Sequence, residues 1–203
     1  ALAEANDLVA KSEHLAKLRD SANAIGATLK QYEDLVAKTV EVNRGIDAAR
    51  KNMDASAAQF IDNAYDFQKS QLQKLDAETG TVDAARLRER QRKVNVINSV
   101  IDLGNFTRIA NFRSQTLRDP KLVLDALGNF DKIRNLLDDI RPVVRQEQNL
   151  RELAAIQSAA NSYRESIMAF VKNWEALQEL TKQREKLANQ LVALVQEVSK
   201  AGV

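Results

Sequence analysis

Apolar residues recur along almost the whole chain with the three- and four-residue spacing that places them on one face of an α-helix. A few positions interrupt this pattern. Arg19-Asp20-Ser21 offers N-cap residues for a new helix, Gly80 is a good C-terminal stop, and Asp119-Pro120 is typical of an N-cap followed by proline. Pro142 ends or kinks the helix that follows. The pattern predicts helices over about residues 1–18, 21–78, 82–117, 120–140 and 146–200.

The composition supports an all-α fold class. The 203 residues include only six Gly and two Pro, so the chain has few places to turn. Aromatic residues make up 5% and charged residues 29%, and the abundant residue types are good helix formers. We therefore exclude folds rich in β-structure.

The helix lengths favour two stacked helical bundles that share two very long helices. At 1.5 Å per residue, helices over 21–78 and 146–200 would each be on the order of 80–90 Å long, against roughly 54 and 32 Å for the two between them. Short loops make successive helices antiparallel neighbours. We expect residues 46–175 to form a complete four-helix bundle. Residues 1–45 with 176–203 form an incomplete bundle, whose open groove a missing first helix or a partner chain would fill.

Several functional classes are excluded by what the sequence lacks. There is no Cys, so disulfides, thiolate zinc sites and cysteine nucleophiles are ruled out, and the single His14 is a poor basis for a metal site. No Gly-rich phosphate loop or nucleophile elbow is present, so we expect neither an enzyme nor a cofactor. A net charge of +2 gives no reason to expect nucleic acid binding.

The chain also shows no membrane-spanning or secretory segment. Its longest uncharged stretch, Leu153–Tyr163, is far shorter than the roughly 18 apolar residues that a transmembrane helix needs. No signal peptide is visible, and the chain begins at Ala1 without Met. We interpret it as a processed protein or a fragment of a longer one.

The helix predicted over 82–117 carries the main candidate for chemistry. Its apolar stripe of Val94, Ile97 and Ile101 becomes polar at Asn105 and Arg108 before Phe112. An arginine on a core stripe needs an anion, because burying an unpaired charge is costly. Arg113 borders this stripe, and the facing helices offer Asn63 and Tyr163, a combination that suits a small carboxylate. In the alternative interpretation, Arg108 pairs with Asp62 or extends outward to solvent.

Two other features favour structural roles. The basic run over residues 86–93 has no interleaved aromatic residues for base stacking, so we predict a solvated helix start, with contact to nucleic acid or an anionic surface as the alternative. Trp174, with Phe170 and Leu177, is predicted to be core where the two bundles meet.

The helix order and three segments resemble a known family. The segments are Leu29-Lys-Gln-Tyr-Glu-Asp-Leu-Val-Ala-Lys through Asn52-Met-Asp-Ala-Ser-Ala, then Arg108-Ile-Ala-Asn-Phe-Arg113, and Ala160-Asn-Ser-Tyr-Arg-Glu-Ser-Ile-Met-Ala-Phe. The chain resembles the helical bimodular sensor domain of bacterial methyl-accepting chemotaxis receptors, also found in some sensor histidine kinases. The resemblance covers the chain from the family's second helix onwards.

The resemblance implies a periplasmic ligand-binding domain of an inner-membrane chemotaxis transducer, with 46–175 as its membrane-distal bundle. Its ligand would be a small organic acid, such as a C4-dicarboxylate or acetate. Arg108 would anchor the carboxylate, supported by Arg113, Asn105, Asn63 and Tyr163. We also expect a homodimer, a membrane-anchored parent chain, and signalling by a small displacement of the last helix. The alternative is a protein-interaction or sensor-kinase domain that reads a periplasmic partner protein.

Overall fold

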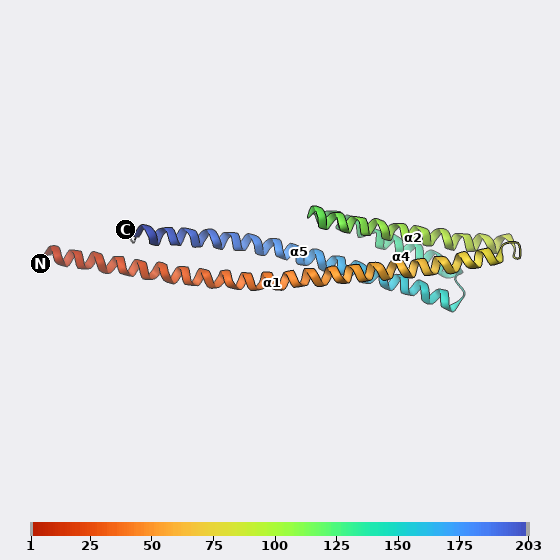
Figure 1. Ribbon diagram of the computed structural model, residues 1–203, viewed down its shortest axis with the longest axis horizontal. Helices are drawn as coiled ribbons and strands as arrows, with labels where there is room; N and C mark the ends of the chain where they lie inside the picture. Colours follow the sequence, from red (N-terminus) through yellow and green to blue (C-terminus); the bar gives the residue numbers. More distant parts are fainter. Residues whose placement is uncertain (1, 202–203) are drawn as a thin grey trace. The chain divides into compact units, whose positions relative to one another are not determined.

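A computed structural model describes residues 2–201, apart from the side chains of residues 2–10, 14 and 201. Within these residues the regular secondary structure is helical and there is no strand (Figure 1). The elements, in chain order, are α1 (Leu2–Glu78), α2 (Ala84–Leu117), α3 (Lys121–Ala126), α4 (Gly128–Ile140), the 3₁₀ helix η1 (Arg141–Val143) and α5 (Glu147–Ala201). The predicted all-α fold class is therefore confirmed.

The predicted break at Arg19-Asp20-Ser21 is wrong, because α1 runs without interruption from Leu2 to Glu78. Asp and Ser are preferred N-caps only where the backbone departs from helical geometry. Nothing in this segment forces such a departure, since the nearest glycine, Gly26, is followed by good helix formers and no proline is present.

The ends of the middle helices follow the cap signals in the sequence. Gly80 has a φ of 82°, a conformation that favours glycine, and it lies just after the end of α1. Asp83 caps α2 by accepting a hydrogen bond of 2.8 Å from the backbone N–H of Arg86. The Asp119 carboxylate accepts one of 3.0 Å from the N–H of Lys121, where α3 begins. α4 ends at Ile140, two residues before Pro142.

The chain divides into two compact units, which we describe separately. Unit 1 consists of residues 1–45 and 173–203, and unit 2 consists of residues 46–172. Both α1 and α5 contribute residues to each unit.

Unit 2 is a helical bundle with an apolar core lined by α1, α2, α4 and α5. Its core includes Met53, Phe60, Phe67, Ile97, Val100, Ile133, Leu137, Ile140, Leu153, Ile156, Tyr163 and Ile167. The predicted apolar stripe of α1 is buried here from Ile46 to Phe67. This bundle holds the polar groups described below.

Unit 1 pairs the first part of α1 with the last part of α5. A shallow groove between the two helices is lined by Leu35 and Lys38 on one side and by Leu187 and Gln190 on the other. Its described buried residues include Thr28 and Thr39, while Leu29 and Val40 are exposed. Trp174 is half-buried, so the prediction of a core tryptophan holds only in part.

None of the helices, over the described residues, combines the length and the apolar character that crossing a bilayer requires.

Candidate functional site

The buried face of α2 changes from apolar to small and polar residues at its midpoint. Val94, Ile97 and Ile101 are buried as predicted, but the buried face then continues through small and polar residues. These residues are Gly104, Thr107, Asn111 and Ser114. The stripe predicted through Asn105, Arg108 and Phe112 is therefore wrong beyond Ile101, and Phe112 is 57% exposed.

A close approach of α1 explains the glycine on this buried face. A Cβ atom at Gly104 would lie 2.3 Å from Cε1 of Phe60, so only glycine lets the Phe60 ring pack against the α2 backbone at this point. Phe60 is fully buried. Counting apolar residues cannot locate a helix face that packs through glycine, threonine and asparagine.

Of the five predicted site residues, Tyr163 is the one that the structure buries, and the charge of Arg108 acts on it. Tyr163 is 1% exposed on α5, and Arg108, half-buried on α2, lies near enough for its charge to act on the phenol. Asn63 and Asn105 are half-buried, and neither makes a side-chain hydrogen bond to another described residue. Arg113 is exposed. Within the described residues, no ion pair joins Arg108 to Asp62, the partner considered in the alternative interpretation.

Four buried polar residues lie in the interior of unit 2, and one of them, Asn111, is near enough to Tyr163 to act on its hydroxyl. We call these residues the polar layer: Thr107, Asn111, Ser114 and Tyr163. Thr107 is satisfied, since its hydroxyl donates to the Leu103 carbonyl at 2.8 Å. The hydroxyls of Tyr163 and Ser114 are buried without a hydrogen-bond partner among the described residues. Such unpaired groups are uncommon in protein interiors and mark the layer as a candidate binding site.

The chemistry of Tyr163 is set by its surroundings. Burial raises the pKa of Tyr163 to about 12, with the negative charge of Asp54 adding to the rise and Arg108 and Asn111 opposing it. Asn111 is close enough to influence the hydroxyl, but no bond of normal geometry joins them. The Phe130 ring packs edge-on against the Tyr163 ring, with centroids 5.5 Å apart. The hydroxyl is therefore neutral near pH 7, held in place, and able to donate a hydrogen bond.

A second polar cluster lies where α1 ends and α2 begins. Arg90 is only 8% exposed, and it donates to both carboxylate oxygens of Glu78 at 2.8 and 3.3 Å and to the Gln71 Oε1 atom at 2.8 Å. Lys93 is 4% exposed, and its ammonium donates to Glu89 at 2.6 Å. The prediction of a solvated basic run is therefore wrong for these two residues.

Charge pairing dominates this second cluster. Hydrogen bonding from Arg90 lowers the pKa of Glu78, and hydrogen bonding from Lys93 lowers the pKa of Glu89. A cleft of about 370 Å³ opens beside Arg90 and Lys93, with Arg145 and Asn149 on its far side. Because both buried cations already have carboxylate partners, the cluster is better suited to tying helices together than to binding an added anion.

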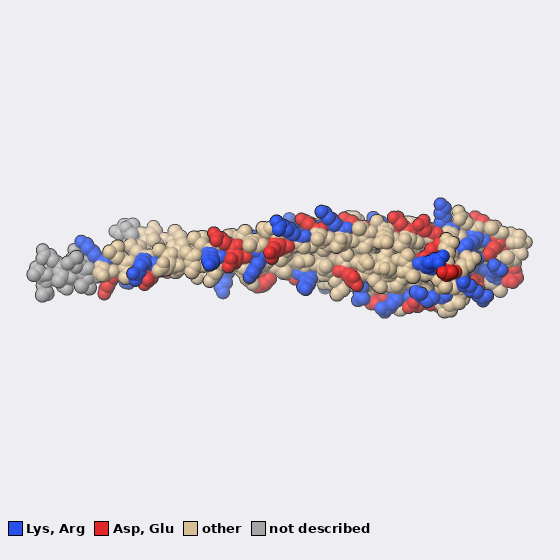
Figure 2. Space-filling model, turned by 90° about the horizontal axis from the view of Figure 1, so that it is seen from below, with Lys and Arg blue, Asp and Glu red and all other residues tan. Residues whose placement is uncertain are grey.

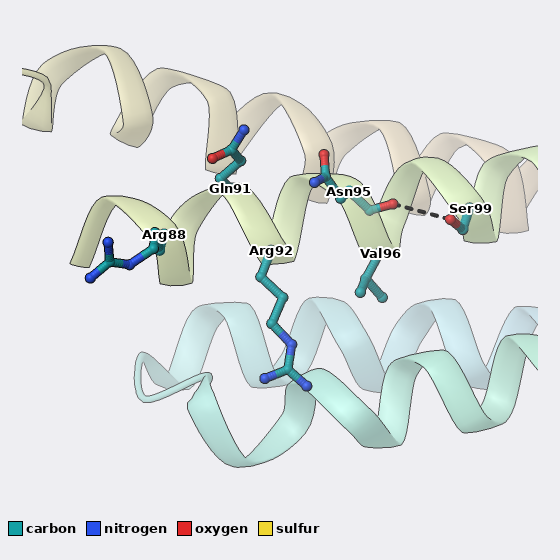
Figure 3. A pocket seen from close by; sticks show the side chains of 6 residues that line it. All are labelled: Arg88, Gln91, Arg92, Asn95, Val96 and Ser99. Atoms are coloured by element: carbon teal, nitrogen blue, oxygen red, sulfur yellow. Dashed lines mark hydrogen bonds between the residues drawn. The ribbon is translucent and has the colours of Figure 1, made fainter. Parts of the chain in front are cut away.

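The remaining basic residues of the run lie on the surface. A shallow groove of about 310 Å³ is lined by Arg88, Gln91, Arg92, Asn95, Val96 and Ser99 (Figure 3). Arg92 extends across it and donates to both oxygens of Asp139 on α4, each at 2.7 Å. Arg88 points away from these groups (Figure 3). The polar side chains that line this groove point in different directions and do not face a common position that a ligand could occupy.

The described side chains form neither a metal site nor, on the face shown in Figure 2, a patch of charges of one sign. Among the residues whose side chains are described, no three His, Cys, Asp or Glu side chains lie close enough to hold a metal ion, and the side chain of His14 falls outside that set. On the face shown in Figure 2, basic and acidic side chains are interspersed.

Comparison of the chain with protein-family models, with curated proteins and with solved structures finds no match.

Proposed function

We propose that this chain is the ligand-binding sensor domain of a bacterial chemotaxis transducer, of the helical bimodular type that its sequence resembles. In this proposal it is extracytoplasmic and binds a small organic acid of the acetate or C4-dicarboxylate class. Unit 2 is the membrane-distal four-helix bundle, and unit 1 is the membrane-proximal bundle that shares its two long helices.

The unpartnered hydroxyl of Tyr163, with Arg108 nearby, is the observation that supports this proposal. A carboxylate bound there would accept a hydrogen bond from Tyr163 and offset the charge of Arg108. Charge-assisted hydrogen bonds of this kind contribute about 1.5 to 3 kcal/mol each. Ser114 offers a further hydroxyl that lacks a partner among the described residues. Asn105, Asn63 and Arg113 remain supporting candidates from the sequence.

The position of these groups suggests how binding would be transmitted. Tyr163 belongs to α5, which continues to Ala201, whereas Arg108 and Asn111 belong to α2. A carboxylate held by both helices would bind better in one relative position of α2 and α5 than in another, and so shift the population between two packings. A displacement of about 1–2 Å along α5 is the size of movement that packed helices deliver.

Calorimetric titration of acetate, succinate and malate tests the proposal. We expect at least one to bind wild-type protein, and Arg108→Ala to weaken it by about 2 kcal/mol, roughly 30-fold in Kd. Arg88→Ala removes an exposed arginine from the same helix and serves as the matched control, with unchanged affinity. The proposal is wrong if none of the three acids binds, or if the two variants behave alike.

A second candidate function is reading a partner protein, and the exposed apolar residues at the end of α2 favour it. Under this alternative the three acids do not bind, and substitutions among those apolar residues abolish signalling while Tyr163→Phe leaves it unchanged.

A further inference from the structure

An acidic residue of α1, Asp54, lies on the face of this helix that packs against α2. Two residues show where this face is. Ile61 packs beside Gly104, because its Cδ1 atom lies 3.3 Å from the place that a Cβ atom would take there. The Gln68 side chain donates a hydrogen bond to Asn98. Seven residues make nearly two helical turns, so Asp54, seven residues before Ile61, lies on the same face.

The same two contacts fix the level of Asp54 along α2. They show that α1 and α2 run antiparallel, since moving seven residues back along α1 moves six residues forward along α2. A further seven residues back lead to Asp54, and the corresponding step along α2 leads from Gly104 to about Asn111. Arg108 is four residues after Gly104, which places it on the side of α2 that meets α1. Asp54 and Arg108 therefore lie at nearly the same level, on the facing sides of the two helices.

The electrostatic surroundings of Tyr163 agree with this placement. The negative charge of Asp54 raises the pKa of the Tyr163 phenol, and the positive charge of Arg108 lowers it. Asp54 and Arg108 form no ion pair with each other, and neither makes a hydrogen bond or ion pair with another described side chain. A carboxylate from α1, a guanidinium from α2 and a neutral hydroxyl from α5 thus surround one position, and the two charges are left unpaired.

We propose that the ligand of this site is a small carboxylate that also carries an ammonium group, which makes it an amino acid. Arg108 and Tyr163 hold its carboxylate, and Asp54 accepts hydrogen bonds from its ammonium group. The inference rests on the proposed function and narrows the ligand class given there. Aspartate is the C4-dicarboxylate that fits, and glycine is the acetate-like acid that fits.

The two charges favour this class over acids that carry only negative groups. A plain dicarboxylate gains from Arg108 but is repelled by Asp54 across from it, and a purely cationic ligand meets the reverse difficulty. In an α-amino acid the two charged groups are attached to the same carbon. Such a ligand can contact two side chains that are too far apart to pair directly, and it offers each of them the opposite charge.

Titration calorimetry with L-aspartate and L-malate tests the inference. The two acids differ at one position, where aspartate carries an ammonium group and malate a hydroxyl. We expect wild-type protein to bind aspartate about fivefold more tightly than malate, as one solvent-exposed ion pair allows. Asp54→Asn removes the charge but keeps the shape of the side chain. It should weaken aspartate binding, strengthen malate binding and abolish the preference.

Two further variants and a second pair of ligands serve as controls. Asp66→Asn removes a charge from an exposed position about 18 Å further along α1 and should leave the preference unchanged. Arg108→Ala should weaken both acids, because both present a carboxylate to it. Glycine and acetate repeat the comparison without the second carboxylate, and glycine should bind more tightly.

The outcomes distinguish this inference from the proposed function. If malate binds in a manner that depends on Arg108, but wild type does not prefer aspartate, the amino-acid class is wrong and the proposed function stands. A preference for aspartate that persists in Asp54→Asn would overturn the role of Asp54. If none of the four acids binds, both the inference and the proposed function are wrong.

Discussion

At the scale of single residues, unit 2 keeps hydroxyl groups in its interior that have no partner. The hydroxyls of Tyr163 and Ser114 are in this position, and so is the Nε2 atom of Gln71. Leaving a buried polar group unpaired costs about 1 to 3 kcal/mol. Tyr163 and Ser114 both belong to the polar layer, where a bound carboxylate would relieve the cost. Removing these hydroxyls should therefore stabilise the ligand-free protein and weaken carboxylate binding.

Tyr163→Phe tests this expectation. Removing the unpaired hydroxyl should stabilise the ligand-free protein by about 1 kcal/mol, which corresponds to a Tm increase of roughly 2–4 °C in calorimetry. The same change should remove the stabilisation that a bound carboxylate provides. A Tyr163→Phe protein that is less stable than wild type would mean that the hydroxyl is satisfied in solution.

The pH dependence of Tyr163 gives an independent check. Its folded-state pKa of about 12 lies above the usual value of 10.0, so the stabilising effect of the neutral form is complete below pH 10 and lost as the pH rises toward 12. Between pH 10 and 12, wild type should lose more stability than Tyr163→Phe in urea unfolding experiments. Parallel loss in both proteins would contradict the burial of this phenol.

The contribution of Glu78 to stability should depend on pH in the opposite direction to that of Tyr163. Hydrogen bonding from Arg90 lowers its folded-state pKa below the usual 4.5, so its contribution is present above that value and lost as the pH falls through the folded-state pKa. Glu78→Gln should therefore be less stable than wild type at pH 7, and this difference should shrink below pH 4.5. The exposed Glu165→Gln variant is the control, with a small difference at every pH. A stability difference between wild type and Glu78→Gln that stays constant down to pH 3 would contradict the ion pair between Glu78 and Arg90.

Some of these residue environments could not be predicted from the sequence. Arg90 and Lys93 belong to a basic run, and a run of charged residues on a helix is expected to lie mainly on the surface, yet both are buried. Lys93 pairs with Glu89 one turn away on α2, but the partners of Arg90, Glu78 and Gln71, lie on α1, and only the turn at Gly80 brings α1 and α2 side by side. Pairing between charges on different helices depends on that tertiary contact, which leaves no local signal.

At the scale of elements, caps were easier to predict than helix faces. The α1 end near Gly80 and the α4 end before Pro142 follow from residue types whose backbone preferences are strong. The buried face of α2 after Ile101 does not, because glycine and asparagine are buried there while Phe106 and Phe112 are exposed. A prediction based on hydrophobicity buries the two phenylalanines and exposes the glycine and the asparagine, which is the reverse of what the structure shows.

Gly104→Ala tests the close packing of α1 against α2. The added methyl group would meet the fully buried Phe60 ring, and overpacking of this kind costs about 1–3 kcal/mol, more than the gain of about 1 kcal/mol in helix propensity. Gly26→Ala is the matched control, since no atom lies within 4 Å of its Cβ position and it should be stabilised by about 0.5–1 kcal/mol. Thermal unfolding distinguishes them, and equal Tm shifts would contradict the contact.

At the scale of the whole molecule, the scarcity of helix-breaking residues was the most informative property of the sequence. Six Gly and two Pro in 203 residues predicted an all-α chain, and the described residues confirm it. The same scarcity explains why α1 continues through residues 19–21, where capping residues alone did not end a helix. Binding activity could not be derived at this scale, because it depends on a few interior groups.

Hydrogen exchange, measured with and without saturating acetate, succinate or malate, tests the proposed binding site most directly. Binding in the polar layer should slow exchange in residues 105–115 of α2 and 160–167 of α5 for at least one acid, and Arg108→Ala should remove that protection. No change in these two segments with any of the three acids, or protection confined to other parts of the chain, would contradict the account.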